Sequence, residues 1–220
     1  MADIETWRTL TEELSRKNVT LVAVSKTKPV ADILDLYEAG QRDFGENYVQ
    51  ELTEKQALLP ADIRWHFIGH LQSNKVKYIA PYVHLIHGVD NARLLAEINK
   101  QAQKNGRIID VLLQMHIAQE ETKFGLDERE TETILQEVPS LPNVRICGLM
   151  GMATNTADES MVQKEFTSLK TLFDRWKNSY FADAPWFNII SMGMSADYKI
   201  AIAAGSNLVR IGSMLFGKRS

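Results

Sequence analysis

One lysine in this sequence stands where covalent chemistry with an aldehyde is possible. Lys26 follows the apolar run 21–24 and shares its alternation with Val22 and Val24. If those valines face the inside of a barrel, Lys26 points into its mouth. Burial there, beside Lys28 and Arg210, would favour the neutral amine, and a neutral lysine amine attacks aldehydes to form imines. A lysine that merely extends to solvent at a strand end is the alternative.

A second group of residues has the composition of an anion site. Ser191-Met-Gly-Met-Ser195 places two serines and a glycine directly before a predicted helix. Amides and hydroxyls at the start of a helix bind anions, and phosphate sites in barrels often follow strands 7 and 8. Gly212 and Ser213, after the last predicted strand, would add further amides. A plain helix cap formed by Ser195, worth about 1 kcal/mol of helix stability, is the alternative.

Arg210 is the third candidate, one residue before the end of the last predicted strand, between Val209 and Ile211. A cation at this position needs an acceptor inside the barrel, as in a structural ion pair, or a ligand. An imine-forming lysine, an anion site and a cation at one barrel mouth together indicate a phosphorylated aldehyde. Pyridoxal 5′-phosphate (PLP) is the common one.

The histidines do not predict a metal site. His66 and His70 have the i, i+4 spacing of metal ligands on a helix. The residues between them, Phe67-Ile68-Gly69, are typical of a strand that leads into a loop. We therefore expect no metal ion in this protein.

Short apolar runs alternate with longer amphipathic segments, and these elements must position the residues above. Strands are predicted at 19–24, 42–45, 64–68, 84–88, 108–117, 144–150, 187–191 and 208–211. Helices are predicted at 31–39, 47–59, 72–80, 91–104, 127–138, 159–177 and 195–204. The strand runs are almost continuously apolar, as expected where both faces are covered. Eight such strands predict one α/β domain over residues 1–220, a single (β/α)8 barrel of the TIM type; an open doubly wound sheet is the alternative.

The two ends of the chain refine this prediction. The tail at 217–220 is too short for an eighth helix, and an extra helix near residues 3–17 would cover the gap that the missing helix leaves. We expect no second domain. The polar candidates all lie at the predicted strand ends, and the strand starts show no comparable set.

Composition excludes several classes of protein. The 220 residues are 45% hydrophobic and 24% charged with a formal net charge of −3, which argues against disorder and against a surface for nucleic acid or anionic membranes. Cys147 is the single cysteine, so no internal disulfide can form, as is typical of a reducing compartment. No apolar run is long enough to span a bilayer, and no signal peptide is evident. We expect a cytoplasmic protein.

Six ordered motifs resemble those of the pyridoxal-phosphate homeostasis proteins (the YggS/PROSC-like family) across essentially the full chain. They are Val22-Ala-Val-Ser-Lys-Thr-Lys-Pro29, Phe44-Gly-Glu-Asn-Tyr48, Trp65-His-Phe-Ile-Gly-His-Leu-Gln-Ser-Asn-Lys75, Gly148-Leu-Met-Gly-Met152, Ser191-Met-Gly-Met-Ser195 and Val209-Arg-Ile-Gly212 with Phe216-Gly217. The resemblance implies a barrel like the N-terminal domain of alanine racemase, with PLP held as an imine.

The resemblance also implies a role for each matching position. Lys26 would carry the PLP imine. The phosphate would be held by Ser195, Gly212 and Ser213, with Ser191 and Met192 lining that side. Asn47 and His66 would line the ring, and Arg210 would meet the pyridine nitrogen. A guanidinium cannot protonate that nitrogen, so the ring becomes a poorer electron sink and carbanion chemistry is discouraged.

These implications favour binding over turnover. Alanine racemase uses a tyrosine from a second, β-rich domain, for which a chain ending at Ser220 leaves no room. We expect a monomer that acts in PLP homeostasis and amino/keto-acid balance, with PLP and small amino acids as ligands and apo PLP-enzymes as candidate recipients. A PLP-dependent enzyme such as a weak amino-acid racemase is the alternative. A Schiff-base aldolase or isomerase without PLP, with Glu46 or Asp90 as base, is a third.

Overall fold

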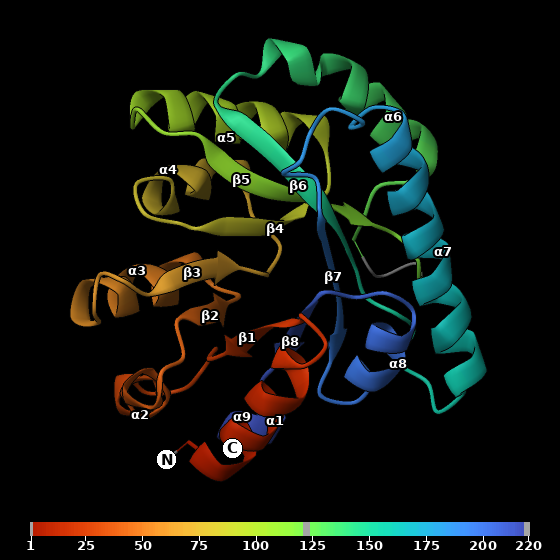
Figure 1. The fold of residues 1–220 in the computed structure, drawn as a ribbon. Coiled ribbons are helices and arrows are strands. Elements are labelled where there is room, and N and C mark those ends of the chain that lie inside the picture. Colours follow the sequence, from red (N-terminus) through yellow and green to blue (C-terminus); the bar gives the residue numbers. More distant parts are fainter. Residues whose placement is uncertain (1, 121–123, 218–220) are drawn as a thin grey trace.

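Eight parallel strands close into a barrel in the computed structural model, which describes residues 2–120 and 124–217 (Figure 1). Each strand pairs with the next along the chain, and β8 pairs with β1. The strands are β1 (Thr20–Val24), β2 (Asp43–Glu46), β3 (Arg64–Phe67), β4 (Leu85–Val89), β5 (Ile109–Met115), β6 (Val144–Gly151), β7 (Ile189–Met194) and β8 (Leu208–Ile211). The predicted single barrel is confirmed, and the open sheet is not formed.

Helices surround the barrel, as the amphipathic segments predicted (Figure 1). They include α2 (Val30–Ala39), α3 (Val49–Leu58), α5 (Ala92–Lys104), α6 (Glu128–Glu137) and α7 (Glu159–Asn178). Three predictions need correction. The segment predicted as a helix over 72–80 is a 3-10 turn, η1 (Ser73–Lys75), followed by the one-turn α4 (Val76–Ile79). The predicted helix over 127–138 ends as α6 at Glu137, and a second 3-10 turn, η2 (Val138–Ser140), follows it. The helix predicted from residue 195 is shorter, α8 (Tyr198–Ala203).

The predicted N-terminal helix is present as α1 (Ile4–Ser15), capped by the Asp3 carboxylate, which accepts from the Thr6 amide. It packs beside α2 and beside a one-turn helix after β8, α9 (Ser213–Phe216). The Asp3 amide donates to the Leu215 carbonyl at 2.8 Å, so the first and last described segments are joined. The sequence predicted no helix after β8, and α9 corrects that prediction.

Two hydrophobic cores lie on opposite faces of the sheet. The larger one fills the space between strands and helices, and includes Leu21, Ala23, Val209 and Ile211. The smaller one lies inside the barrel and consists of Val22, Leu85, Leu112, Cys147, Met150 and Leu208, with Met152 and Ile189 packed against it. Alternate residues of a strand therefore belong to different cores. The inner core is small because buried polar side chains, described below, fill the rest of the barrel interior.

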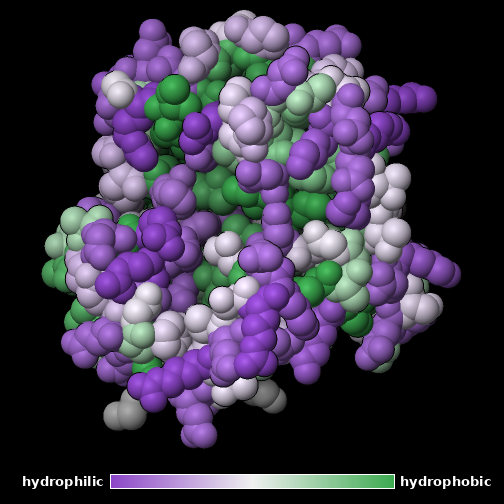
Figure 2. All heavy atoms as spheres, viewed as in Figure 1, coloured by the Kyte–Doolittle hydropathy of each residue, from purple (hydrophilic) through white to green (hydrophobic). Residues whose placement is uncertain are grey.

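The face of the molecule in Figure 2 is mainly hydrophilic at its periphery, with hydrophobic residues gathered in its hollowed central region. Among the helices of the described residues, none is both long enough and apolar enough to cross a membrane.

Candidate functional site

A cavity of about 330 Å³ opens at the barrel mouth, where β1, β7 and β8 run out into their loops. Six of the residues predicted for the site line it: Lys26, Asn47, Ser195, Arg210, Gly212 and Ser213. Apolar side chains, Val24, Ile68, Met152 and Met194, complete most of the wall, together with Lys28, Ala196 and Gly217. The cavity thus combines an amine, a guanidinium and two hydroxyls within a partly apolar wall, as is typical of small-molecule sites.

Lys26 reaches this cavity from the turn that follows β1. Val22 belongs to the inner core, so the alternation that predicted an inward Lys26 is correct for the strand. The next residue, Thr27, has a φ of +62°, an uncommon conformation for a β-branched residue. Backbone strain of this kind is retained where surrounding contacts enforce it, and it is frequent at functional sites.

Those contacts come from α3 and fix the backbone on both sides of Lys26. The Thr27 amide donates to Glu51 Oε1 at 2.6 Å. The buried Lys55 ammonium donates to Glu51 Oε1 at 2.7 Å, to the Ser25 carbonyl at 2.8 Å and to Glu46 Oε1 at 2.8 Å. Ser25 Oγ donates to Glu46 Oε1 at 2.6 Å. Burial raises the pKa of Glu46, and the neighbouring Lys55 opposes that rise.

On the predicted phosphate side, Ser195 lies two residues before the N-cap of α8, because this helix starts later than the sequence predicted. Ser195 does not cap α8; Asp197 occupies the N-cap position, and its carboxylate accepts from the Met194 amide at 2.6 Å. Ser195 is half-buried and faces the mouth cavity together with Gly212 and Ser213. The plain helix cap, which was the alternative for Ser195, is therefore not formed.

Arg210 lies inside the barrel on β8 and is 4% exposed. It is paired in register with Val22 of β1, which also points inward. Its Nη1 donates to Ser191 Oγ at 2.6 Å and its Nη2 to the Gly151 carbonyl at 3.2 Å. Burial lowers the pKa of Arg210 to about 10, with Asp197 acting in the opposite direction, so the guanidinium stays charged at neutral pH.

Three residues predicted for the site lie elsewhere than on the cavity wall. Ser191 is fully buried beneath Arg210, and Met192 points the other way, into the outer core. His66 lies toward the opposite rim, where it lines a second cavity. The alternation of β7 explains the first two, since successive residues of a strand face opposite sides.

The opposite rim carries a polar group that the sequence interpretation missed. Asp43 and Arg64, the first residues of β2 and β3, and His84, directly before β4, line a cavity of about 330 Å³ together with His66. Arg64 forms two hydrogen bonds to the Asp43 carboxylate. The signal was available, because a closed barrel brings strand starts together just as it does strand ends.

Neither carboxylate considered as a catalytic base lines the mouth cavity. Glu46 is fully buried against Ser25 and Lys55. Asp90 is bonded to His70 Nδ1 at 2.9 Å. A larger cavity of about 590 Å³ lies outside the barrel between α3 and η1 and shares Asn47 with the mouth cavity. Lys26 and Arg210 line the smaller mouth cavity and not this larger one.

Comparison with known proteins identifies relatives over nearly the whole chain. The family model described as "Alanine racemase, N-terminal domain" matches residues 4–220. A pyridoxal phosphate homeostasis protein of Aquifex aeolicus (strain VF5) is 40% identical over 200 residues, 90% of this chain and 86% of that protein.

Solved structures agree with this relationship. PipY of Synechococcus elongatus PCC7942, solved with PLP bound, is 35% identical and superposes with a TM-score of 0.88 over 97% of this chain and 99% of its own. Alanine racemase of Streptomyces coelicolor A3(2) is 16% identical, with a TM-score of 0.78 over 99% of this chain and 59% of its own. At that identity the likeness concerns the fold alone.

Proposed function

This chain belongs to the family of pyridoxal phosphate homeostasis proteins, and from that membership we propose that it binds PLP in the mouth cavity and acts in PLP homeostasis. The observation that carries the proposal is the presence of Lys26, Arg210 and the Ser195, Gly212 and Ser213 group in one cavity. An amine for an aldehyde, donors for a phosphate and a cation for a ring nitrogen are the groups that PLP requires.

The residues of the cavity fit this cofactor. Asn47 Oδ1 is buried and accepts no hydrogen bond within the described protein, so it is available to a donor on a ligand. Ser195 and Ser213 provide hydroxyls on the side where the phosphate is proposed to bind. Met152 and Met194 provide adaptable apolar contacts for a flat ring.

Lys26 is proposed to be the covalent anchor. When PLP is bound, its aldehyde provides the electrophile, and the Lys26 amine condenses with it to an imine with release of one water. The contacts from α3 to Ser25 and Thr27 support this assignment, because they hold the backbone on both sides of Lys26 in one conformation.

We further propose that PLP is bound, exchanged and delivered rather than used in efficient turnover. Arg210 is a guanidinium with a pKa of about 10 and gives no proton to a pyridine nitrogen at neutral pH. The ring with an unprotonated nitrogen is a poorer electron sink, and amino-acid racemisation needs an electron sink to stabilise the carbanion at Cα. Small amino acids are proposed to exchange at the anchor and so to link the protein to amino/keto-acid balance. Apo PLP-enzymes are proposed recipients.

Titration of the apo protein with PLP, followed by its visible absorption, tests the proposal. The unmodified protein is expected to develop an imine band that saturates at one equivalent. Lys26→Ala should lack this band, and Lys28→Ala, the matched control two residues away, should retain it. An unmodified protein that stays colourless with PLP contradicts the proposed function.

A further inference from the structure

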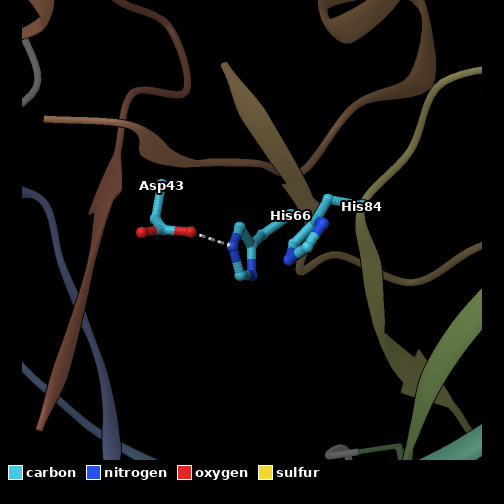
Figure 3. Close-up of side chains that lie close together, drawn as sticks. All are labelled: Asp43, His66 and His84. Carbon is cyan, nitrogen blue, oxygen red and sulfur yellow. Dashed lines mark hydrogen bonds and ion pairs between the residues drawn. The ribbon is translucent and has the colours of Figure 1, made fainter. Parts of the chain in front are cut away.

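A continuous chain of buried side chains connects Arg210 to the opposite rim of the barrel. Arg210 Nη1 donates to Ser191 Oγ at 2.6 Å, and Ser191 Oγ lies 2.9 Å from His87 Nδ1. His87 Nε2 lies 2.9 Å from His66 Nδ1, and His66 Nε2 lies 3.0 Å from Asp43 Oδ1 (Figure 3 shows this last contact). Ser191 and His87 are 0% exposed, and Asp43, the most accessible member, is only 8% exposed.

The chain has one direction of donation. Although burial opposes ionisation, hydrogen bonds from His66 and Arg64 hold the pKa of Asp43 below its usual range, so this carboxylate accepts only. At the other end the Arg210 guanidinium only donates, so the Ser191 hydroxyl gives its hydrogen to His87 Nδ1. His87 then donates through Nε2 to His66 Nδ1, and His66 donates through Nε2 to Asp43. Every hydrogen bond thus has one donor and one acceptor, and in each of them the donor is the group nearer to Arg210.

His87 is neutral in this arrangement. Burial lowers its pKa well below the usual value, and the nearby charge of Arg210 acts in the same direction. A neutral His87 uses one ring nitrogen to accept from Ser191 and the other to donate to His66. The hydroxyl hydrogen of Ser191 is therefore committed to His87, and its oxygen can only accept from Arg210.

The outer end of this series of side chains resembles a metal cluster, but the ligand atoms of Asp43 and His66 already have hydrogen-bond partners. Ligand atoms of Asp43, His66 and His84 lie within 4.8 Å of one another (Figure 3). Both oxygens of Asp43 accept from Arg64, and both ring nitrogens of His66 are hydrogen-bonded. We therefore interpret these residues as the anchored end of the chain.

We propose that Ser191 and His87 are positioning residues for Arg210, which hold its guanidinium in the orientation that meets the ring nitrogen of PLP. The inference rests on the proposed function. Arg210 also donates to the Gly151 carbonyl at 3.2 Å, so its 2.6 Å bond to Ser191 is the shorter of the two. Because the guanidinium only donates, the Ser191 oxygen accepts from it, and His87 Nδ1 fixes the rotation of the hydroxyl by accepting its hydrogen.

Binding of PLP is compared with binding of an analogue whose ring nitrogen is replaced by a C–H group. The unmodified protein should bind PLP about tenfold tighter or more, because the analogue leaves a donor of Arg210 without an acceptor. Ser191→Ala should reduce this preference to about threefold or less. Cys147→Ala is the matched control, because it also removes one buried heavy atom from the barrel interior but none from the hydrogen-bonded series between Arg210 and Asp43.

Two further variants act through His87 and leave Ser191 in place. His87→Leu removes both ring nitrogens and should lose the preference as Ser191→Ala does. His87→Gln retains an acceptor and a donor on one planar amide and should restore most of it. Circular dichroism and melting temperature check that each variant is folded.

The outcomes separate this inference from the proposed function. An unmodified protein that binds neither compound overturns both. The positioning role alone is overturned if the unmodified protein prefers PLP and the Ser191→Ala and His87→Leu variants lose affinity for both compounds equally. Absence of any preference in the unmodified protein also overturns the inference while PLP binding stands.

Discussion

At the scale of single residues, Arg210 and Lys26 reach one cavity because β1 and β8 are neighbours in register. Val22 is paired with Arg210, and Lys26 follows four residues later on the same alternation. The cation is therefore deeper in the barrel and the amine nearer its mouth. A ligand with an aldehyde, a ring nitrogen and a phosphate can meet all three groups of the wall at once.

The phosphate contacts yield a prediction at this scale. Ser195→Ala combined with Ser213→Ala should weaken PLP binding far more than pyridoxal binding, because only the phosphate loses donors. Each lost hydrogen bond to a charged group is worth about 1.5–3 kcal/mol. Calorimetric titration with the two compounds measures the difference, and equal losses would show that neither serine contacts the phosphate.

Residue types and alternation were sufficient to predict that Lys26 and Arg210 lie at the barrel mouth, but they did not predict the hydrogen-bonded side chains inside the barrel. A histidine within an apolar strand, such as His87, has no local feature that separates a hydrogen-bonded role from simple packing. Its partners Ser191 and His66 are 104 and 21 residues away in sequence. Only the closed barrel brings them together.

At the scale of elements, β7 and β8 explain why some predicted bounds were wrong. The register between these strands shifts between Ser191 and Met194, where Gly193 has a φ of +95°. β7 therefore continues through Met194, and α8 starts later than the sequence predicted. Such a shift depends on a neighbouring strand and leaves no periodic signal in the sequence itself.

A close approach of β6 to β7 gives a prediction at this scale. A Cβ atom at Gly148 would lie 1.8 Å from the Ile189 carbonyl oxygen, so Gly148→Ala must displace one strand. We expect a loss in the free energy of unfolding of more than about 4 kcal/mol. Gly106→Ala is the control, because Gly106 also has a positive φ but open space around it. Urea unfolding that finds equal losses would contradict this packing argument.

At the scale of the whole molecule, the closed barrel separates a mouth that holds the proposed ligand from a rim that anchors Arg210. The alternation of strands and helices was enough to predict this architecture, because eight such units leave few other arrangements. The polar opposite rim was missed although a closed barrel also gathers strand starts, because Asp43, Arg64 and His84 belong to three separate segments of the sequence. The monomeric state and the cytoplasmic location stay predictions.

Turnover is tested on the intact protein loaded with PLP. Exchange of the Cα hydrogen of added amino acids in deuterated water should stay far below about 1 s⁻¹, a low turnover number for an enzyme. Arg210→Glu, which places a carboxyl group near the ring nitrogen, should raise it. Nuclear magnetic resonance follows the exchange, and rapid exchange by the unmodified protein would favour an amino-acid racemase.

The most direct measurement of the central claim is the identity of the residue that becomes covalently linked to PLP. Borohydride reduction converts an imine to a stable secondary amine, and peptide fragmentation then assigns it to one lysine. We predict a single adduct on Lys26, with Lys28 in the same loop unmodified. An adduct on Lys28 or on another lysine, or no adduct in a protein saturated with PLP, would contradict the assignment of Lys26 as the anchor.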